Sequence, residues 1–323
     1  MKDFNLFKMF TPKPLDKDKE FTEAPTNLKG FFIMLGRKFW NISNLNLLFV
    51  FCNFPIFFLL YTFTGQLSQH ISAVADPLYP AYYGMITISK SPQLMSLCPF
   101  FSRFVDMAVP TTAERVFQCI SLLTIITFGL SSVGSAYVIR GYNRLDPVFL
   151  ASDYFGAIKR NLRQGLIVGA LDVLISAVLV WDFIFWNAQT GFINAVFYYV
   201  SLFLIVLYFF MRYYIYTLLI TFDLSVFKIF KNAFIFAFLG FKRNIMAFIG
   251  VIAVVVLNVY LFYLLPPLGI LLPLVITFSL CNFITGYASY PVIKKYMIDP
   301  YYGNDADNSE IDEGQEPIFE DRG

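Results

Sequence analysis

The chain has 323 residues, of which 58% are hydrophobic and only 14% charged, and its formal net charge is +2. Soluble domains carry about 25% charged residues, so a water-soluble fold of this size would leave too much apolar surface in water. We therefore expect a bilayer to cover part of the chain. The four cysteines contain no C-x-x-C pair, so the sequence predicts no disulfide framework, no metal site and no cofactor.

The N-terminal segment, residues 1–43, is polar, basic and interrupted by prolines, which is unlike a cleavable signal peptide. Its last part, 28–41, is apolar and ends with Arg37, Lys38 and Trp40. Because basic residues and tryptophan are typical of the membrane–water interface, this part predicts an interfacial helix that leads into the first span.

About 20 mostly apolar residues are needed for a helix to cross a bilayer. Such stretches predict an all-α integral membrane protein with about six transmembrane helices in three hairpins, within a membrane domain of residues 44–296. Pro55 and Pro273 fall inside spans, where we expect neighbouring helices to satisfy the carbonyl groups that they free. The expected spans lie near 44–64, 115–138, 165–186, 192–211, 245–265 and 268–290.

One long segment on the opposite side from the termini, residues 65–114, connects the first two spans and holds His70, the only histidine. It is too apolar for a free linker, so we expect it to fold onto the outer membrane surface or the mouth of the bundle. A loop of this kind is where an extracellular ligand or partner would bind. A single histidine does not make a metal site, because metal binding needs several donors.

Lysines and arginines are concentrated before the first span, between the second and third, between the fourth and fifth, and after the sixth. The positive-inside rule therefore predicts that both termini are cytoplasmic. The tail, residues 297–323, is acidic and poor in apolar residues, and we expect it to be disordered.

The connection between the second and third spans predicts an amphipathic helix. Pro147 suits its first turn and Asp146 its N-cap. The helix is expected at the membrane surface with its basic side toward anionic headgroups, although a simple link between two spans would have the same pattern. The apolar stripe is Val148, Ala151, Phe155, Ile158 and Leu162, and the opposite face holds Asp153, Lys159, Arg160 and Arg163.

The pattern G-x-x-x-x-G-x-x-Y-x-x-R-x-x-x-R-x-x-x-V-F-x-x-S-D-(x)₅-K-R-N-x-x-Q-G around this connection resembles the signature of the YesL-like family of bacterial integral membrane proteins. The stretch from Asn44 to Pro55 also resembles the first span of that family. The resemblance implies a multi-pass protein of the bacterial plasma membrane, of undetermined biochemistry, often encoded beside carbohydrate uptake systems, and it implies no catalytic residues. The matching positions are Gly129, Gly134, Tyr137, Arg140, Arg144, Val148, Phe149, Ser152, Asp153, Lys159, Arg160, Asn161, Gln164 and Gly165.

Each expected hairpin follows a basic segment that contains asparagine: 37–41 (RKFWN), 159–161 (KRN) and 242–244 (KRN). A duplicated hairpin is one explanation, because transporters often contain internal repeats. The other is that any helix entering a membrane from the cytoplasm needs basic residues and caps. The sequence leaves both open.

Charged groups inside a bilayer are costly and are functional candidates by default. Asp172 lies in the third span and Arg212 ends the fourth. Because consecutive spans are antiparallel, these side chains are expected to face each other as a structural ion pair; the other interpretation places Asp172 in a solute path. Asp182 lies near the outer boundary, where water reaches. Polar groups expected to form hydrogen bonds between helices are Asn53, Asn258 and Asn282.

The chain has no phosphate-binding loop, zinc-protease or nucleophile-elbow motif, so no catalytic residues are expected, and its basic residues form no nucleic-acid patch. The leading hypothesis is a non-catalytic accessory or scaffold protein linked to bacterial carbohydrate uptake. Its expected partners are the lipid bilayer and a carbohydrate ABC transporter or associated signalling components. The alternative is a small-solute transporter or channel with Asp172 in its path.

Overall fold

The computed structural model describes residues 26–74, 76–89, 91–96 and 104–302, and the described chain is almost entirely helical. It divides into two compact units. Of the described residues, 26–53 and 125–302 belong to one, called the bundle unit, and those between 54 and 124 form the other, called the β-hairpin unit. The two units are described separately.

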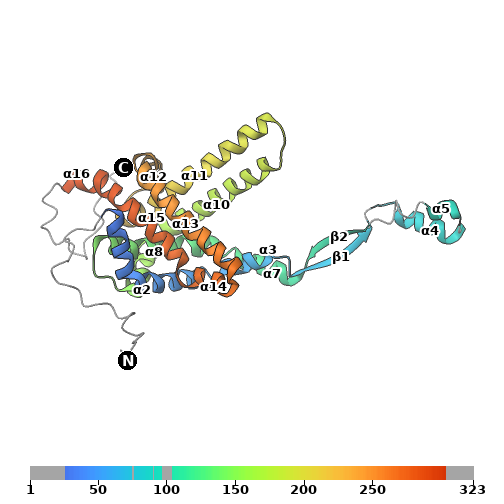
Figure 1. Ribbon diagram of the computed structural model, residues 1–323, viewed down its shortest axis with the longest axis horizontal. Helices are drawn as coiled ribbons and strands as arrows, with labels where there is room; N and C mark the ends of the chain where they lie inside the picture. Colours follow the sequence, from blue (N-terminus) through green and yellow to red (C-terminus); the bar gives the residue numbers. More distant parts are fainter. Residues whose placement is uncertain (1–25, 75, 90, 97–103, 303–323) are drawn as a thin grey trace, which may run out of the picture. The chain divides into compact units, whose positions relative to one another are not determined.

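The bundle unit consists of packed helices, most of them joined to the next by a short connection (Figure 1). Two segments near its C-terminal end, η2 and η3, are π-helical. The elements are α2 (Leu28–Cys52), α8 (Thr124–Arg144), α9 (Leu150–Arg160), α10 (Leu162–Asn187), α11 (Phe192–Thr221), α12 (Val226–Leu239), α13 (Phe241–Leu264), α14 (Pro266–Leu272), η2 (Pro273–Thr277), α15 (Phe278–Ile293), η3 (Lys294–Ile298) and α16 (Asp299–Tyr302).

Five helical stretches are long and apolar enough to cross a membrane, and a sixth is obtained if the broken pair Leu28–Cys52 and Pro55–Thr62 counts as one span. The expected all-α membrane fold with about six spans is therefore confirmed. Most helices run further than the expected windows. The five stretches are Thr112–Arg144, Leu162–Asn187, Phe192–Thr221, Phe241–Leu264 and Pro266–Ile298.

The first span differs from the expectation. The interfacial helix expected over residues 28–41 and the start of the first span form one helix, because α2 continues without interruption from its N-cap Asn27 to Cys52. The expected boundary between residues 43 and 44 is therefore not a helix end. The helix stops at Asn53, whose backbone N–H still bonds to the Phe49 carbonyl, and Pro55 starts a second helix, so this pair of helices forms at most a broken span.

Side chains of α2 contact the backbone of the irregular segment that starts at Pro273. The side-chain amide of Asn46 donates to the carbonyl oxygens of Pro273 (2.9 Å) and Leu274 (2.8 Å). Its own oxygen accepts the backbone N–H of Ser279 (2.8 Å). Ser43, one turn earlier, donates to a further carbonyl of η2 (3.0 Å). A neighbouring helix thus provides hydrogen-bond partners for backbone groups of the irregular segment.

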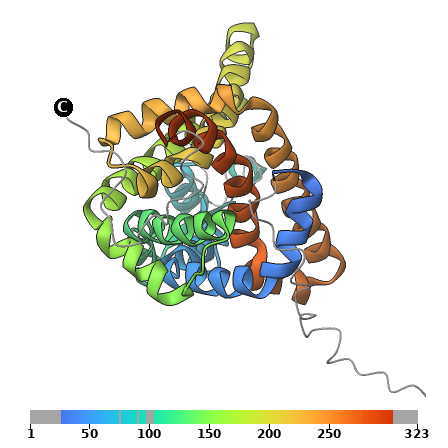
Figure 2. The same cartoon turned by 90° about the vertical axis from the view of Figure 1, so that its left-hand side faces the viewer.

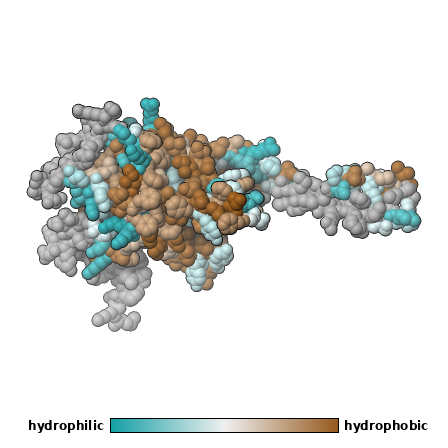
Figure 3. Space-filling view, turned by 90° about the horizontal axis from the view of Figure 1, so that it is seen from above, coloured by the Kyte–Doolittle hydropathy of each residue, from teal (hydrophilic) through white to brown (hydrophobic). Residues whose placement is uncertain are grey.

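Apolar side chains of the bundle unit form two buried clusters. One surrounds the C-terminal half of α11, from Tyr208 to Leu219, and includes residues of α10, α12, α13 and α15. The other joins α2, α8, α9 and α15 around Tyr154 and Phe283. Toward the left of Figure 3, hydrophilic side chains gather at one end of the bundle unit, next to a broad apolar belt.

The β-hairpin unit is built on one antiparallel pair of strands, β1 (Ser68–Val74) and β2 (Phe104–Pro110), in which His70 lies opposite Ala108. The sequence analysis predicted no strands here. Thr111 caps α7 through the backbone N–H of Glu114 (3.3 Å). The helices of this unit are α3 (Pro55–Phe63), α4 (Tyr79–Ser89), α5 (Pro92–Ser96) and α7 (Thr112–Ser121).

The expectation of a disordered tail from residue 297 is wrong for its first residues, because η3 and α16 continue the helix to Tyr302. The rest of the tail and residues 1–25 lie outside the described part of the chain.

We predict that Asn46→Ala lowers the free energy of unfolding by roughly 1–3 kcal/mol, because it leaves buried backbone groups of the last span without a partner. Reversible unfolding in mixed detergent micelles measures the change. Asn44→Ala is the matched control, since Asn44 is exposed on the same helix. Equal losses in both variants would contradict the bridging role of Asn46.

Candidate functional site

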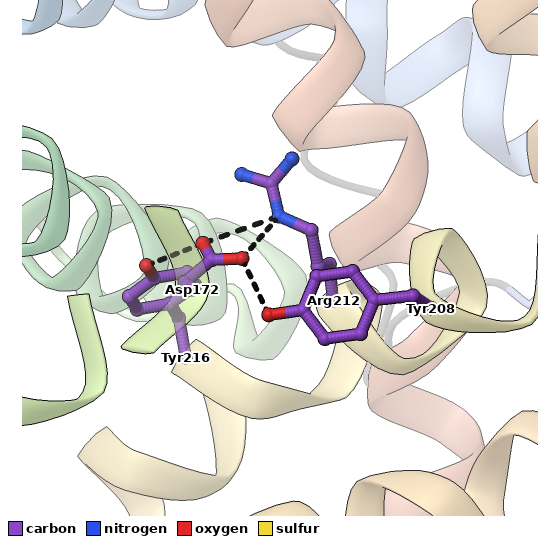
Figure 4. A network of polar contacts seen from close by, with 4 residues as sticks. All are labelled: Asp172, Tyr208, Arg212 and Tyr216. Atoms are coloured by element: carbon purple, nitrogen blue, oxygen red, sulfur yellow. Dashed lines mark hydrogen bonds and ion pairs between the residues drawn. The ribbon is translucent and has the colours of Figure 1, made fainter. Parts of the chain in front are cut away.

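A fully buried carboxylate lies between α10 and α11. Asp172 of α10 has no exposed surface and accepts hydrogen bonds from the hydroxyl groups of Tyr208 (2.8 Å) and Tyr216 (2.7 Å). The Nε atom of Arg212 lies 3.0 Å from Oδ1 and 3.2 Å from Oδ2 of the same carboxylate. Figure 4 shows these four side chains converging on one point.

The expected ion pair between Asp172 and Arg212 is therefore confirmed. The sequence analysis missed the two tyrosines, although a signal was available. Tyr208, Arg212 and Tyr216 are spaced by four residues, which places them on one face of a helix. The three polar side chains of this stripe all contact Asp172, the acidic residue on the facing side of α10.

The geometry fixes what this cluster can do chemically. Both oxygens of Asp172 are occupied by donors, and its charge is balanced by Arg212, so the burial cost of the carboxylate is offset. The guanidinium also lies 5.2 Å above the ring of Phe128 from α8, and its two Nη atoms point away from Asp172 (Figure 4). The arrangement is that of a structural tie between α8, α10 and α11.

Asp182, the other acidic residue of α10, has a local role. Its carboxylate accepts the indole N–H of Trp186, one turn further along the helix (2.8 Å). This hydrogen bond lies within α10 and does not involve the Asp172 cluster.

Helix α8 crosses α10 at glycines. A Cβ atom on Gly129 would collide with the Cα of Gly169 and would lie 2.7 Å from the carbonyl oxygen of Gly165. Gly165 and Gly169 form a G-x-x-x-G pair, the arrangement that lets two membrane helices approach closely. The sequence analysis named Gly129 and Gly165 as signature residues without recognising this pair. The close crossing places Phe128 beside Arg212.

Gly134, one helix turn further along α8, makes room for the ring of Tyr154. A Cβ atom at Gly134 would lie 2.7 Å from this ring, and Tyr154 is completely buried. Burial raises the pKa of the Tyr154 hydroxyl above its ordinary value. The hydroxyl ends near Cys52, Ser131 and Ser135, but none of them is aligned for a hydrogen bond. Tyr154 thus inserts α9 between α2 and α8.

The signature residues Tyr137 and Arg140 fasten the end of α8 to α11. Arg140 donates to the carbonyl oxygen of Ile220 (3.2 Å) and to the hydroxyl of Thr221 (3.3 Å), so it caps the C-terminus of α11. Its guanidinium lies 5.1 Å from the ring centre of Tyr137, and that of Arg160 lies 5.0 Å from the same ring. Both contacts are cation–π interactions, and the one made by Arg160 joins α9 to α8.

The start of α9 differs from the expectation. The helix begins at Leu150 rather than at Pro147, and its N-cap is Phe149. Asp146 does not cap it, because its carboxylate pairs with Arg144 (3.2 Å). The carboxylate of Asp153 takes part in the cap instead, accepting the backbone N–H of Phe149 (2.7 Å).

None of the five residues of the expected apolar stripe of α9 is fully buried in the bundle. The residues buried in the bundle are Tyr154 and Ala157, whereas Ala151, Phe155 and Leu162 are exposed. The helix therefore packs through its tyrosine and presents part of the stripe outward, on the same side as its basic residues.

The asparagines of the two K-R-N segments act as caps. Asn161 donates to the Ala157 carbonyl at the end of α9 (3.0 Å), and Asn244 donates to the Ala237 carbonyl of α12 (2.9 Å). Asn244 also accepts the hydroxyl of Tyr214 (2.7 Å). Asn161 lies at the end of the helix that it caps, whereas Asn244 caps α12 from the following helix, α13. These two positions fit the capping explanation at least as well as they fit a duplicated hairpin.

Two of the three asparagines expected to join helices do so. Asn53 donates to the hydroxyl of Ser131 in α8, and Asn258 of α13 donates to the hydroxyl of Thr277 in η2 (3.1 Å). At Asn282 the recorded hydrogen bond involves the backbone carbonyl, which accepts from the side chain of Thr285. The expectation is confirmed for Asn53 and Asn258.

Among the described residues, no group of three His, Cys, Asp or Glu side chains is placed to hold a metal ion. Comparisons of the chain with protein-family models, curated proteins and solved structures find no match. The resemblance to the YesL-like family therefore stays a prediction, and the functional roles of its signature residues have to be argued from the contacts above.

We predict that Gly169→Ala lowers the free energy of unfolding by roughly 1–3 kcal/mol, because the added methyl group pushes α8 away from α10. Unfolding in mixed micelles measures the change. Gly36→Ala is the matched control: it is also a helix glycine, but a Cβ atom there meets nothing within 4 Å. A neutral Gly169→Ala variant would show that the close crossing is not needed.

We predict that Asp172→Asn destabilises the protein by roughly 3–5 kcal/mol, because it leaves Arg212 without its counter-charge. Arg212→Gln should cost a similar amount, and the double variant should cost less than the sum of the two. A double-mutant cycle of unfolding free energies measures this coupling. Additive effects would mean that the two side chains do not depend on each other.

Proposed function

We propose that this protein is a non-catalytic accessory or scaffold protein of the bacterial plasma membrane, linked to carbohydrate uptake, with both termini in the cytoplasm. The observation that carries the proposal is the hairpin α10–α11. It projects from the other helices of the bundle unit in two perpendicular views (Figures 1 and 2).

The projecting part of the hairpin has apolar surface on all sides. Trp181 is 72% exposed and Phe192 85%, and most residues between them and the Asp172 cluster are also exposed. The buried core takes in only the base of the hairpin, namely Val168 near the start of α10 and the half of α11 from Tyr208 onward. Membrane helices associate through packed side chains, so an extended pair of uncovered helices is a surface for the helices of another membrane protein.

The hairpin is also well ordered internally, as a docking element has to be. Trp186 of α10 stacks on Phe197 of α11 with ring centres 4.7 Å apart, and Phe183 lies 5.1 Å from Tyr198. The Asp172 cluster fixes the base of the hairpin to the bundle unit. A rigid hairpin presents its side chains without a further ordering cost on binding.

The alternative, a solute transporter with Asp172 in its path, has less support. A transport residue needs access to ions or solute, whereas both oxygens of Asp172 already accept hydrogen bonds from Tyr208, Tyr216 and Arg212. The scaffold proposal predicts no solute flux through the wild-type protein in proteoliposomes. A flux that Asp172→Asn abolishes while the fold remains intact would favour the transporter.

The scaffold proposal predicts that a photo-crosslinking benzoylphenylalanine at Phe203 of α11 captures a membrane protein in native membranes. A probe at Tyr260 of α13 is the control, because this residue is similarly exposed but lies on a helix packed within the bundle unit. Mass spectrometry of the adducts should identify a component of a carbohydrate ABC transporter or of its signalling apparatus at Phe203 only.

Two results would contradict the proposal. One is the formation of lipid adducts alone at both positions, which would make the hairpin an ordinary lipid-facing element. The other is a protein adduct that belongs to neither transport nor signalling, which would leave the scaffold role but remove the link to carbohydrate uptake.

A further inference from the structure

Helix α12 presents phenylalanine and lysine together on its outer face. Phe227 is 78% exposed, and Lys231, Phe234 and Phe238 follow on the same side, while Ile229, Ala233 and Phe236 pack inward. Lys242, at the start of α13, is exposed as well. The outward phenylalanines are not part of either buried cluster.

The exposed face of α9 and the first turn of α10 has the same composition. Phe149 is 75% exposed, and Phe155, Arg160, Leu162 and Arg163 are also exposed. Of these residues, Arg160 contacts the Tyr137 ring, and Arg163 projects one turn beyond it. Lys159 is a further exposed basic residue on this helix.

The start of α10, which follows α9, contacts the segment that precedes α12. The side-chain amide of Gln164 in α10 donates to the carbonyl oxygen of Leu224, just before α12. In Figure 2 both helices lie at the rim of the bundle unit, on its left-hand side. Each helix then leads directly into a long apolar span, α9 through Asn161 into α10 and α12 through Gly240 into α13.

We propose that these two faces form one binding surface for anionic phospholipid headgroups, here called the basic rim, made up of Phe149, Phe155, Lys159, Arg160, Leu162, Arg163, Phe227, Lys231, Phe234, Phe238 and Lys242.

Charge complementarity identifies the occupant. The exposed charges of the basic rim are lysine and arginine. The nearby carboxylate of Asp153 is engaged with the Phe149 N–H, and the exposed carboxylate of Asp223, just before α12, is outnumbered by the lysines and arginines of the rim. Interleaved phenylalanines enter the acyl-chain boundary while the basic groups remain at headgroup depth. A soluble acidic protein would match the charges but would leave the phenylalanines unused.

The test uses the full-length protein reconstituted in phosphatidylcholine bilayers. Electron paramagnetic resonance compares how strongly the protein immobilises spin-labelled phosphatidylglycerol and spin-labelled phosphatidylcholine. The wild type is expected to prefer phosphatidylglycerol. In the double variant Arg163→Glu/Lys231→Glu this preference is expected to fall by roughly fivefold or more, because each basic residue at a membrane surface contributes to the attraction of anionic lipids. Added salt should weaken the wild-type preference.

The control is Lys295→Glu, which reverses an exposed basic residue on η3, outside the basic rim. It should keep the preference, as should the charge-conserving variant Arg163→Lys/Lys231→Arg. Circular dichroism and gel filtration confirm that each variant is folded. The proposal is overturned if the wild type binds both lipids equally, if Lys295→Glu has the same effect as the double variant, or if the double variant keeps the preference.

Discussion

The buried carboxylate of Asp172 is the interaction on which the arrangement of the bundle unit depends. A charge without solvent is tolerated only when every lone pair has a partner, and here Tyr208, Tyr216 and Arg212 provide them. These contacts hold α10 and α11 together at the base of the hairpin. Because Arg212 also lies over Phe128, the same cluster positions α8.

The same rule explains the other polar residues of the bundle unit. Asn46 satisfies the irregular backbone around η2, Arg140 caps α11, and Asn244 caps α12. In an apolar medium a backbone group without a partner is costly, so side chains from a neighbour are placed at these three points. The hairpin α10–α11 is free to project because its own helices satisfy their backbones internally.

Much of this could be predicted from the sequence. The spans followed from hydropathy, and the pairing of Asp172 with Arg212 followed from antiparallel neighbours. The pattern of α9 does not tell which of its residues are buried in the protein. Lipid and the protein interior accept the same apolar residues, so the identity of Phe155 does not show which of the two it contacts. The first residue of α9 could not be predicted, because Leu145 adopts a positive φ of 65° and the chain turns before the helix begins.

The central claim is that the Asp172–Arg212 pair is a permanent structural tie. The most direct measurement is hydrogen exchange of the Arg212 Nε–H, followed by nitrogen-15 nuclear magnetic resonance of the protein in lipid nanodiscs. The account predicts one resonance that exchanges far more slowly than that of exposed Arg163 and is lost in Asp172→Asn. Exchange as fast as that of Arg163, or two interconverting resonances, would contradict it.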